Sequence, residues 1–225
     1  MLFLLFGSSA AGKTFALNGL RDRVRNLAIH DFDELGVPAG ADRAWRQRSN
    51  EIWLRRALDY QARGIDLLLA GQTPLGELLA TPSALLIDGI SACLVDCDDE
   101  TRTARLQVRG EEWLARAHAE LDDYLSWAAW MRRHAEDPRW LPEVIVTEDG
   151  LPEMRWDRWS DWRAGDPRWR VRLIDTSALP VEQVAVALAE WIGDERELRR
   201  SGAHPLAAWA ARLRADQLGG GRSQT

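Results

Sequence analysis

An eight-residue stretch near the start of the chain, GSSAAGKT at positions 7–14, constrains the fold more than any other feature of the sequence. It matches the pattern G-x-x-x-x-G-K-[S/T], in which small residues let consecutive backbone N–H groups surround phosphate oxygens. The pattern has this meaning only between a buried strand and a helix. Residues 2–6 are an unbroken apolar run, typical of a parallel strand buried on both faces, and apolar residues recur at helical spacing from Lys13 onward. The stretch therefore predicts a strand, a phosphate-binding loop (P-loop) and a helix whose N-terminus faces the phosphates.

The charge composition singles out one residue of this loop. Of the 29 lysines and arginines, 28 are arginine and the remaining one is Lys13. A compact ammonium group and a planar guanidinium are not interchangeable at a phosphate, so the exception indicates a specific role. We predict that Lys13 contacts the β- and γ-phosphates of ATP and that the hydroxyl of Thr14 binds Mg²⁺. The rest of the predicted cradle is Gly7, Ser8, Ser9, Ala10, Ala11 and Gly12.

Short apolar runs alternate with helical patterns along most of the chain, which is typical of a parallel sheet built from strand–helix–strand units. After the first strand, we expect strands at 26–30, 65–71, 90–96 and 171–177. Helices are expected at 41–63, 98–110, 181–192 and 204–216. A further short helix is expected after the turn Gln72-Thr73-Pro74 and ends at Leu79. The pattern predicts an α/β fold in three layers, with a central parallel sheet between helices.

Residues 111–170 interrupt this alternation and hold eight of the twelve tryptophans. We expect a tryptophan-rich lid made of helices and a hairpin that turns at Asp149–Gly150. Trp113, Trp127 and Trp130 fit the buried face of a helix. A group of alternating aromatic and basic residues allows two interpretations. The residues could form a surface that stacks on a ring or base of a ligand, or they could pack into a hydrophobic core, which we favour. The group is Arg155, Trp156, Arg158, Trp159, Trp162 and Arg163.

The bulk properties limit the class of protein. A chain of 225 residues suggests one domain, which we place at 1–217, with a disordered tail at 218–225. The net charge of −6 counts against a nucleic-acid ligand, and no apolar stretch approaches the roughly 20 residues of a membrane span. The N-terminus lacks the basic region of a secretion signal. We predict that Cys93 and Cys97 are reduced, buried thiols. We therefore expect a cytoplasmic protein, and its oligomeric state stays open.

Two acids, Asp31 and Asp33, follow the second predicted strand. Ligands of open α/β sheets bind at the carboxyl ends of the strands. A kinase needs one acid beside Mg²⁺ and another to orient or deprotonate the accepting hydroxyl. We assign Asp31 to the metal and Asp33 to the acceptor; the alternative is a solvated acidic turn.

The order of P-loop, acidic second strand, LVDCDDETRTARLQVRG and VRLIDTSALPVEQVAVALAEWI resembles the small P-loop kinases. These include shikimate and gluconate kinases, chloramphenicol phosphotransferase, zeta toxins and nucleoside monophosphate kinases. The resemblance covers about 1–110 and 170–193 and leaves the insertion unmatched. It implies that Arg105 and Arg109 begin the lid and bind nucleotide phosphates, and that Thr176 and Ser177 lie near the adenine. It also implies that Gln72 and Thr73 meet the acceptor.

The chain departs from this family in two places. The strand beside the P-loop strand ends Gly71-Gln72-Thr73 and carries no acid, so Asp31 is preferred for the metal, with Asp88 as its rival. The segment also lacks the Gly-aromatic-Pro-Arg stretch of monophosphate kinases, which counts against a nucleotide acceptor. Two roles are open for Arg46: it could bind an anionic acceptor, or it could form ion pairs with Glu51 and Asp42.

These features predict an ATP- and Mg²⁺-dependent phosphotransferase that acts on a hydroxyl of a small molecule. A nucleoside or nucleotide kinase is one alternative. A nucleotide-dependent switch or assembly module that hydrolyses ATP slowly is another. A polynucleotide kinase is a third, against which the net charge counts.

Overall fold

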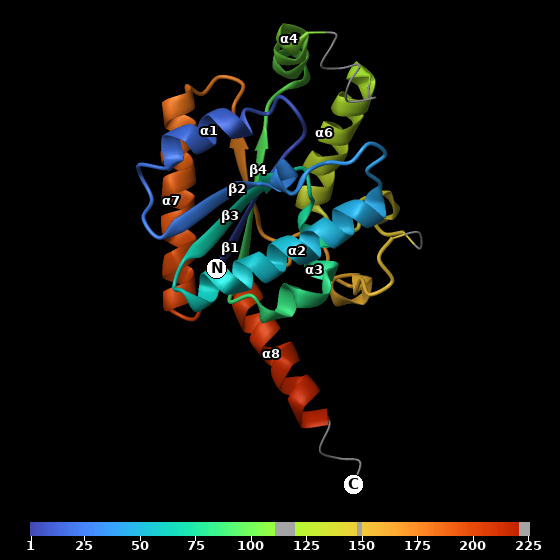
Figure 1. Cartoon of the computed structure of the whole chain (residues 1–225), viewed down its shortest axis with the longest axis vertical. Helices are drawn as coiled ribbons and strands as arrows, with labels where there is room; N and C mark the ends of the chain where they lie inside the picture. Colours follow the sequence, from blue (N-terminus) through green and yellow to red (C-terminus); the bar gives the residue numbers. More distant parts are fainter. Residues whose placement is uncertain (111–119, 148–149, 221–225) are drawn as a thin grey trace.

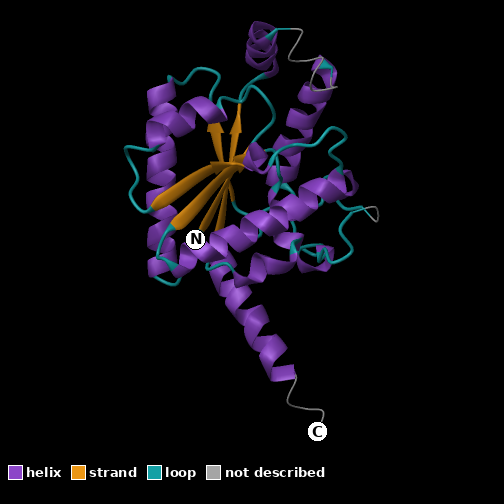
Figure 2. Cartoon of the chain, viewed as in Figure 1, coloured by secondary structure: helices purple, strands orange, loops and turns teal. Residues whose placement is uncertain are grey.

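A five-stranded, all-parallel sheet forms the centre of the protein (Figure 2). The computed structural model describes residues 1–110, 120–147 and 150–220, with the side chains of 217–220 left out. The sheet order is β2-β3-β1-β4-β5. The strands are β1 (Leu2–Phe6), β2 (Leu27–Asp31), β3 (Asp66–Gly71), β4 (Ile90–Asp96) and β5 (Val171–Asp175). Because all five run in the same direction, their carboxyl ends meet at one edge of the sheet, called here the carboxyl edge.

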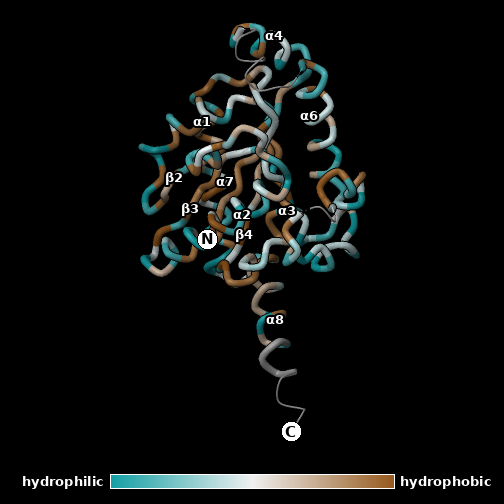
Figure 3. The backbone as a smooth tube through the Cα atoms, turned by 45° about the vertical axis from the view of Figure 1, so that its right-hand side comes forward, coloured by the Kyte–Doolittle hydropathy of each residue, from teal (hydrophilic) through white to brown (hydrophobic). Residues whose placement is uncertain are grey.

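Helices cover both faces of this sheet (Figure 1). Side chains of β1 alternate between the faces, so Phe3 and Leu5 join one hydrophobic core and Leu4 and Phe6 join the other. On the first face lie α1 (Lys13–Leu20) and α7 (Val181–Arg200). On the second lie α2 (Arg43–Ala62), α3 (Leu75–Ala80), α6 (Leu121–Glu136) and α8 (Pro205–Gly220). In Figure 3 hydrophobic residues gather along the strands and hydrophilic residues along the outer loops.

The remaining elements connect these layers. The helix α4 (Asp99–Arg109) stands at the carboxyl edge, beyond the end of β4 (Figure 1). Within the described ranges, short 3₁₀ turns lie between these elements: η1 (Phe32–Leu35), η2 (Pro82–Leu86), η3 (Pro142–Val144) and η4 (Trp156–Arg158). No helix in the described ranges is long and apolar enough to cross a membrane.

The predicted strands and helices are confirmed, with differences at the C-terminal part of the chain. The fifth strand ends at Asp175 rather than 177, and α7 continues to Arg200 rather than 192. Ion pairs explain the longer helix, because Glu195 pairs with Arg170 and Arg196 with Asp66. The last helix reaches Gly220, so residues 218–220, which we expected in a disordered tail, are helical. Residues 221–225 lie outside the described part.

The hairpin predicted in the insertion is wrong for the residues that are described. Between Pro142 and Arg158 these residues form 3₁₀ turns and loops, and Asp149 itself lies outside the described ranges. Backbone N–H groups there bond to neighbouring helices instead of a partner strand. Leu151 N–H donates to Oε1 of Gln47 in α2 (2.6 Å), and Arg155 N–H donates to the carbonyl of Ala80 (2.7 Å).

The described tryptophans of the insertion belong mainly to the core, the reading that we favoured. Trp159, Trp162 and Trp169 are at most 4% exposed. The indole N–H of Trp159 donates to the carbonyl of Gly76 in α3 (2.8 Å), and Trp162 packs edge-on against Trp209 of α8. Trp113 lies outside the described residues. The insertion therefore extends the hydrophobic core of the second face over the side of α3.

Candidate functional site

The loop 7–14 joins β1 to α1 at the carboxyl edge and packs closely on its neighbours. A Cβ at Gly7 would overlap the carbonyl oxygen of Val95, so only glycine fits beside the end of β4. Ala10 has a left-handed backbone with φ 61°. Gly12, with φ 93°, is the N-cap of α1, and it has no side chain that could accept from the first N–H groups of the helix.

Five consecutive carbonyls of this loop accept hydrogen bonds from side chains: those of Gly7, Ser8, Ser9, Ala10 and Ala11. Arg102 donates to the Ser9 carbonyl, and Arg105 donates to the Ala10 carbonyl (3.2 Å). The hydroxyl of Thr176 donates to the Ala11 carbonyl (2.8 Å). Because side chains engage these carbonyls, the N–H groups of the left-handed turn are the donors left for an anion, as in an anion-binding nest.

Lys13 supplies the remaining contacts, because its Nζ donates to the carbonyls of Gly7 (2.6 Å) and Ser8 (3.1 Å). Its side chain lies across the loop and is half-buried. Desolvation lowers the pKa of Lys13 to about 8, while the carboxylate of Asp31 opposes this shift. The guanidinium groups of Arg102 and Arg109 lower the pKa further. Lys13 is therefore a cation at neutral pH in a loop surrounded by other positive charge, which suits a polyanionic ligand.

Asp31 and Asp33 lie close enough to Lys13 for both of their charges to raise its pKa. Asp31 begins the turn η1, where its Oδ1 accepts from Asp33 N–H (2.9 Å). Desolvation and then the negative charge of Asp31 raise the pKa of Asp33, whereas Lys13 lowers it. The two carboxylates thus repel each other, and a divalent cation between them and a phosphate would relieve this repulsion. Among the described residues, no three acids, histidines or cysteines are placed so that they could hold a metal ion together, so Mg²⁺ here would depend on phosphate oxygens and water.

The geometry explains why β3 ends without an acid. Gly71 pairs with Phe6, the residue just before the loop. A Cβ at Gly71 would lie 2.8 Å from Cβ of Phe32, so no carboxylate fits there. The same turn that fills this space, η1, presents Asp31 and Asp33 beside the loop.

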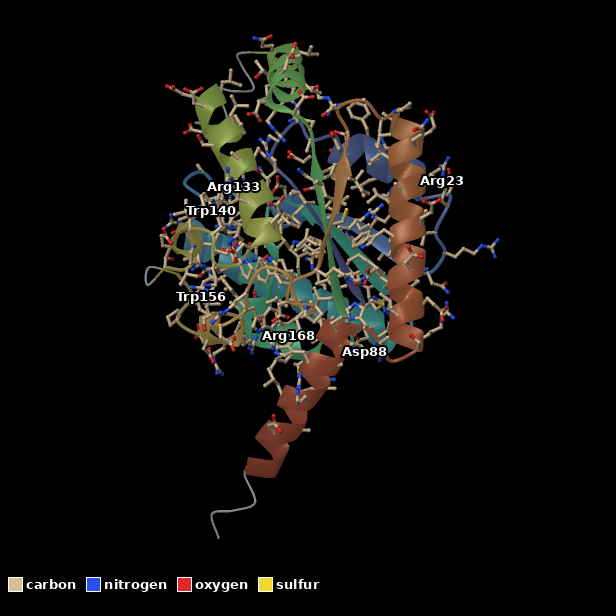
Figure 4. All side chains as sticks on the ribbon, turned by 180° about the vertical axis from the view of Figure 1, so that it is seen from behind. Arg23, Asp88, Arg133, Trp140, Trp156 and Arg168 are labelled. Atoms are coloured by element: carbon tan, nitrogen blue, oxygen red, sulfur yellow. The ribbon has the colours of Figure 1, made fainter. Side chains whose placement is uncertain are left out.

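Asp88, the rival for the metal, lies at the wrong end of the sheet. It precedes β4, whereas the loop follows the carboxyl end of β1. Asp88 pairs with Arg199 near the C-terminal end of α7. Figure 4 shows it near the start of α8, far from α4. Asp88 therefore does not reach the loop.

Helix α4 brings two of the predicted residues to the loop. Besides the Ala10 carbonyl, Arg105 donates to the hydroxyl (2.9 Å) and the carbonyl (2.7 Å) of Thr176. Arg109, at the exposed end of α4, lies close enough to lower the pKa values of Lys13 and Tyr124. Arg105 therefore approaches the loop from the side of β5.

Arg102 is a site residue that the sequence analysis missed. It is fully buried and bridges the Ser9 carbonyl and the carboxylate of Asp96 at the end of β4. The signal was present, because positions 102, 105 and 109 share one face of a helix. Asp98, which caps that helix by accepting from Thr101 N–H (2.6 Å), fixes where the face begins.

Thr176 and Ser177 follow β5, where we predicted contact with the adenine. Thr176 is buried beneath the loop, and its hydroxyl is engaged with Ala11 and Arg105. Ser177 donates to Oδ1 of Asp175 (2.6 Å) and accepts from Asp98 N–H (2.8 Å). Thr176 therefore braces the loop, and contact of this turn with a base stays a prediction.

Three of the predicted acceptor residues lie on α2 (Arg46) and between β3 and α3 (Gln72 and Thr73). Arg46 pairs with neither Glu51 nor Asp42; its Nε donates to Oε2 of the fully buried Glu77 (2.7 Å). Its guanidinium also lies 5.8 Å from the ring centroid of Trp127 in α6. Of the pair after β3, Gln72 is exposed and Thr73 is buried. These residues border the carboxyl edge on the side of η1.

Comparisons with known proteins add little to this geometry. No family model and no curated protein matches the chain. Among solved structures, an unliganded sugar kinase from Janibacter sp. HTCC2649 is 14% identical, with 85% of this chain and 94% of that chain covered and a TM-score of 0.48. An uncharacterised protein from Eubacterium ventriosum ATCC 27560 is 11% identical, with 86% and 98% covered and a TM-score of 0.43. Similarities at this level identify no family, so the functional argument rests on the site itself.

Proposed function

We propose that this chain is an ATP-dependent phosphotransferase of the P-loop type that transfers the γ-phosphoryl group to a hydroxyl of a small molecule. One arrangement carries the proposal: side chains engage five carbonyls of the loop 7–14, its lysine lies across the turn, and the charges of Asp31 and Asp33 act on that lysine. A phosphate cradle and an acidic pair at one edge are the two parts that phosphoryl transfer requires.

The loop and Lys13 would bind the β- and γ-phosphates. Thr14, exposed at the first turn of α1, and Asp31 would hold Mg²⁺ together with phosphate oxygens and water. When bound, Mg²⁺ neutralises charge on the phosphates and orients them. Asp31 also caps η1 and therefore keeps Asp33 at a fixed distance from the loop.

Asp33 would orient the accepting hydroxyl and take its proton at a carboxylate oxygen. Its raised pKa makes it a better base than a free aspartate. Arg105 and Arg109 would stabilise the charge that develops on the transferred group. Arg102 is fully buried and holds the Ser9 carbonyl, so we assign it as a positioning residue.

The test is an ADP-release assay with MgATP and pooled hydroxyl compounds, followed by detection of the phosphorylated product by mass spectrometry. Wild type should release ADP in an acceptor-dependent way. Lys13→Ala and Lys13→Arg should both lose this activity, since an arginine fork cannot replace the ammonium between two carbonyls. Arg23→Ala, at an exposed arginine just beyond α1, is the matched control and should retain it.

Two results would contradict the proposal. Full activity in Lys13→Arg would show that the loop does not bind phosphate in the proposed way. ADP release that no acceptor accelerates would favour the nucleotide-dependent switch instead.

A further inference from the structure

Buried polar atoms without partners gather between α2 and α3. Gln47, Asn50, Thr73 and Glu77 are each at most 1% exposed. Among the described residues, eight buried side-chain atoms lack a hydrogen-bond partner, and five belong to these four residues. They are Gln47 Nε2, both amide atoms of Asn50, Thr73 Oγ1 and Glu77 Oε1. Buried polar groups without partners destabilise a fold, and each one needs a physical explanation.

The four residues come from adjoining elements. Gln47 and Asn50 lie three residues apart and so share one face of α2. This helix packs against α3, and the bond from Arg46 to Glu77 joins the two helices. Burial raises the pKa of Glu77, against the opposing charge and hydrogen bond of Arg46 and the close approach of the Gln47 amide. Thr73 lies between the end of β3 and the first turn of α3.

The same part of α2 contacts the turn that carries Asp33. The indole N–H of Trp53 donates to the Phe32 carbonyl (3.1 Å), and Trp45 meets the ring of Phe32 edge-on at a centroid distance of 5.8 Å. Gln47 and Asn50 lie between these two tryptophans in sequence. Three of the five unpartnered atoms therefore belong to α2, the helix that contacts η1, the turn of the proposed base.

The chemistry of these atoms selects a class of ligand. Arg46 and Glu77 neutralise each other. What remains are acceptors on Asn50 and Glu77, amide donors on Gln47 and Asn50, and the Thr73 hydroxyl, which does both. Adjacent hydroxyl groups complement such a mixture because each donates and accepts. An anionic group would instead meet the carboxylate of Glu77, whose ion-pair partner Arg46 is already engaged.

We propose that Gln47, Asn50, Thr73 and Glu77 form the acceptor site and that the acceptor is a neutral polyhydroxylated molecule, a sugar or polyol. This inference rests on the proposed phosphotransferase function and names its substrate class. The site is closed in this structure, because Leu151 N–H bonds to Gln47 and the adjoining Gly150 lies against the same side chain. Entry of an acceptor therefore requires this contact to open or α2 and α3 to part.

Binding can be measured without nucleotide, which separates this inference from the proposed function. Thermal shift and ligand-observed NMR would compare neutral hexoses, pentoses, inositols and sugar alcohols with aldonic acids and sugar phosphates. Neutral polyols should raise the melting temperature and compete with one another, and the anionic compounds should not. A preference for the anionic compounds, or no binding in the whole panel, would overturn the inference.

Two substitutions test the site itself. Asn50→Leu and Thr73→Val remove unpartnered polar atoms, so each should raise the melting temperature of the free protein by about 2–4 °C. Each should also weaken polyol binding, so that at least ten times more polyol is needed to produce the same rise in melting temperature. Lower stability in both variants would mean that ordered water already satisfies these atoms, and the inference would fail.

Gln61→Leu is the matched control on the same helix. Its Oε1 accepts from Asp88 N–H (2.7 Å), so this variant should lose stability but keep the polyol response. MgATP affinity is measured in every variant and in the wild type. If the wild type bound polyols but not MgATP, the proposed function would fail, and the four residues would remain a polyol-binding site but not the acceptor site of a kinase.

Discussion

The guanidinium of Arg105 donates to the hydroxyl of Thr176 (2.9 Å), which itself donates to the carbonyl of Ala11 (2.8 Å). This chain of hydrogen bonds connects α4, the end of β5 and the candidate phosphate loop. A guanidinium that already holds a threonine hydroxyl in the free protein needs little reorganisation to meet a phosphate. The relay therefore couples the shape of the loop to the position of α4.

Thr176→Val should weaken MgATP binding by about tenfold, because it removes two hydrogen bonds at the loop, each with a net value of about 1 kcal/mol. Isothermal titration calorimetry measures this change. Thr103→Val is a matched control, since its hydroxyl bonds only to the Asp99 carbonyl on the exposed side of α4 (2.7 Å). Equal affinities in the two variants would show that the relay does not shape the nucleotide site.

The catalytic efficiency with ATP should fall as pH rises through about 8, where the free enzyme loses the proton on Lys13. The charged form binds phosphate, so activity is present below this pKa and lost above it. Bound phosphates stabilise the ammonium, and the fall in kcat should therefore come at higher pH than the fall in kcat/KM. A kcat/KM profile that is flat from pH 7 to 9.5 would contradict the role of Lys13.

Asp33→Asn should reduce kcat by at least 10²-fold and change ATP affinity little, because its proposed role lies in the transition state. Asp31→Asn should instead raise the Mg²⁺ concentration required for half-maximal activity. Asp88→Asn serves as the comparison, since its ion pair with Arg199 is remote from the loop. Wild-type rates in both Asp31 and Asp33 variants, with an inactive Asp88 variant, would show that the acids are assigned wrongly.

The protein should lose stability between pH 6.5 and 5 because of His134. Burial lowers the pKa of His134 from 6.5 to about 4, although the Trp140 carbonyl and the charge of Asp137 oppose the shift. The folded state thus favours the neutral ring, so this stability is present above pH 6.5 and is lost as the pH falls toward 4. The full effect is about 3 kcal/mol at most.

Urea unfolding at pH 7, 6 and 5 measures this loss above the range in which most carboxylates titrate. In His134→Phe the ring can keep its stacking on Trp130 but no longer takes up a proton. The loss between pH 7 and 5 should therefore be smaller in this variant. An identical pH dependence in both proteins would exclude His134 as the cause.

Local sequence patterns were sufficient for the strand, loop and helix that carry Lys13. Five consecutive buried residues and a glycine-rich turn before an apolar helix depend on backbone preferences within a few residues, and these are readable from sequence. The alternation of strands and helices likewise predicted the parallel sheet. The adjacency of the acids and the loop followed from the rule that parallel strands share one carboxyl edge.

Contacts between distant segments decided the rest. The absence of an acid at Gly71 depends on Phe32, 39 positions away in the chain, and the role of Arg102 depends on the Ser9 carbonyl. The expected hairpin did not form in the described residues because Gln47 and Ala80 offered its backbone other acceptors. Arg46 likewise pairs with Glu77 and not with Asp42 or Glu51, which are nearer in the sequence, because α2 packs against α3. The sequence alone determined which segments form elements and which loop bears the lysine. Only the tertiary structure decided which polar groups meet, because the partner of a buried charge or amide is set by the packing of the elements and not by distance along the chain.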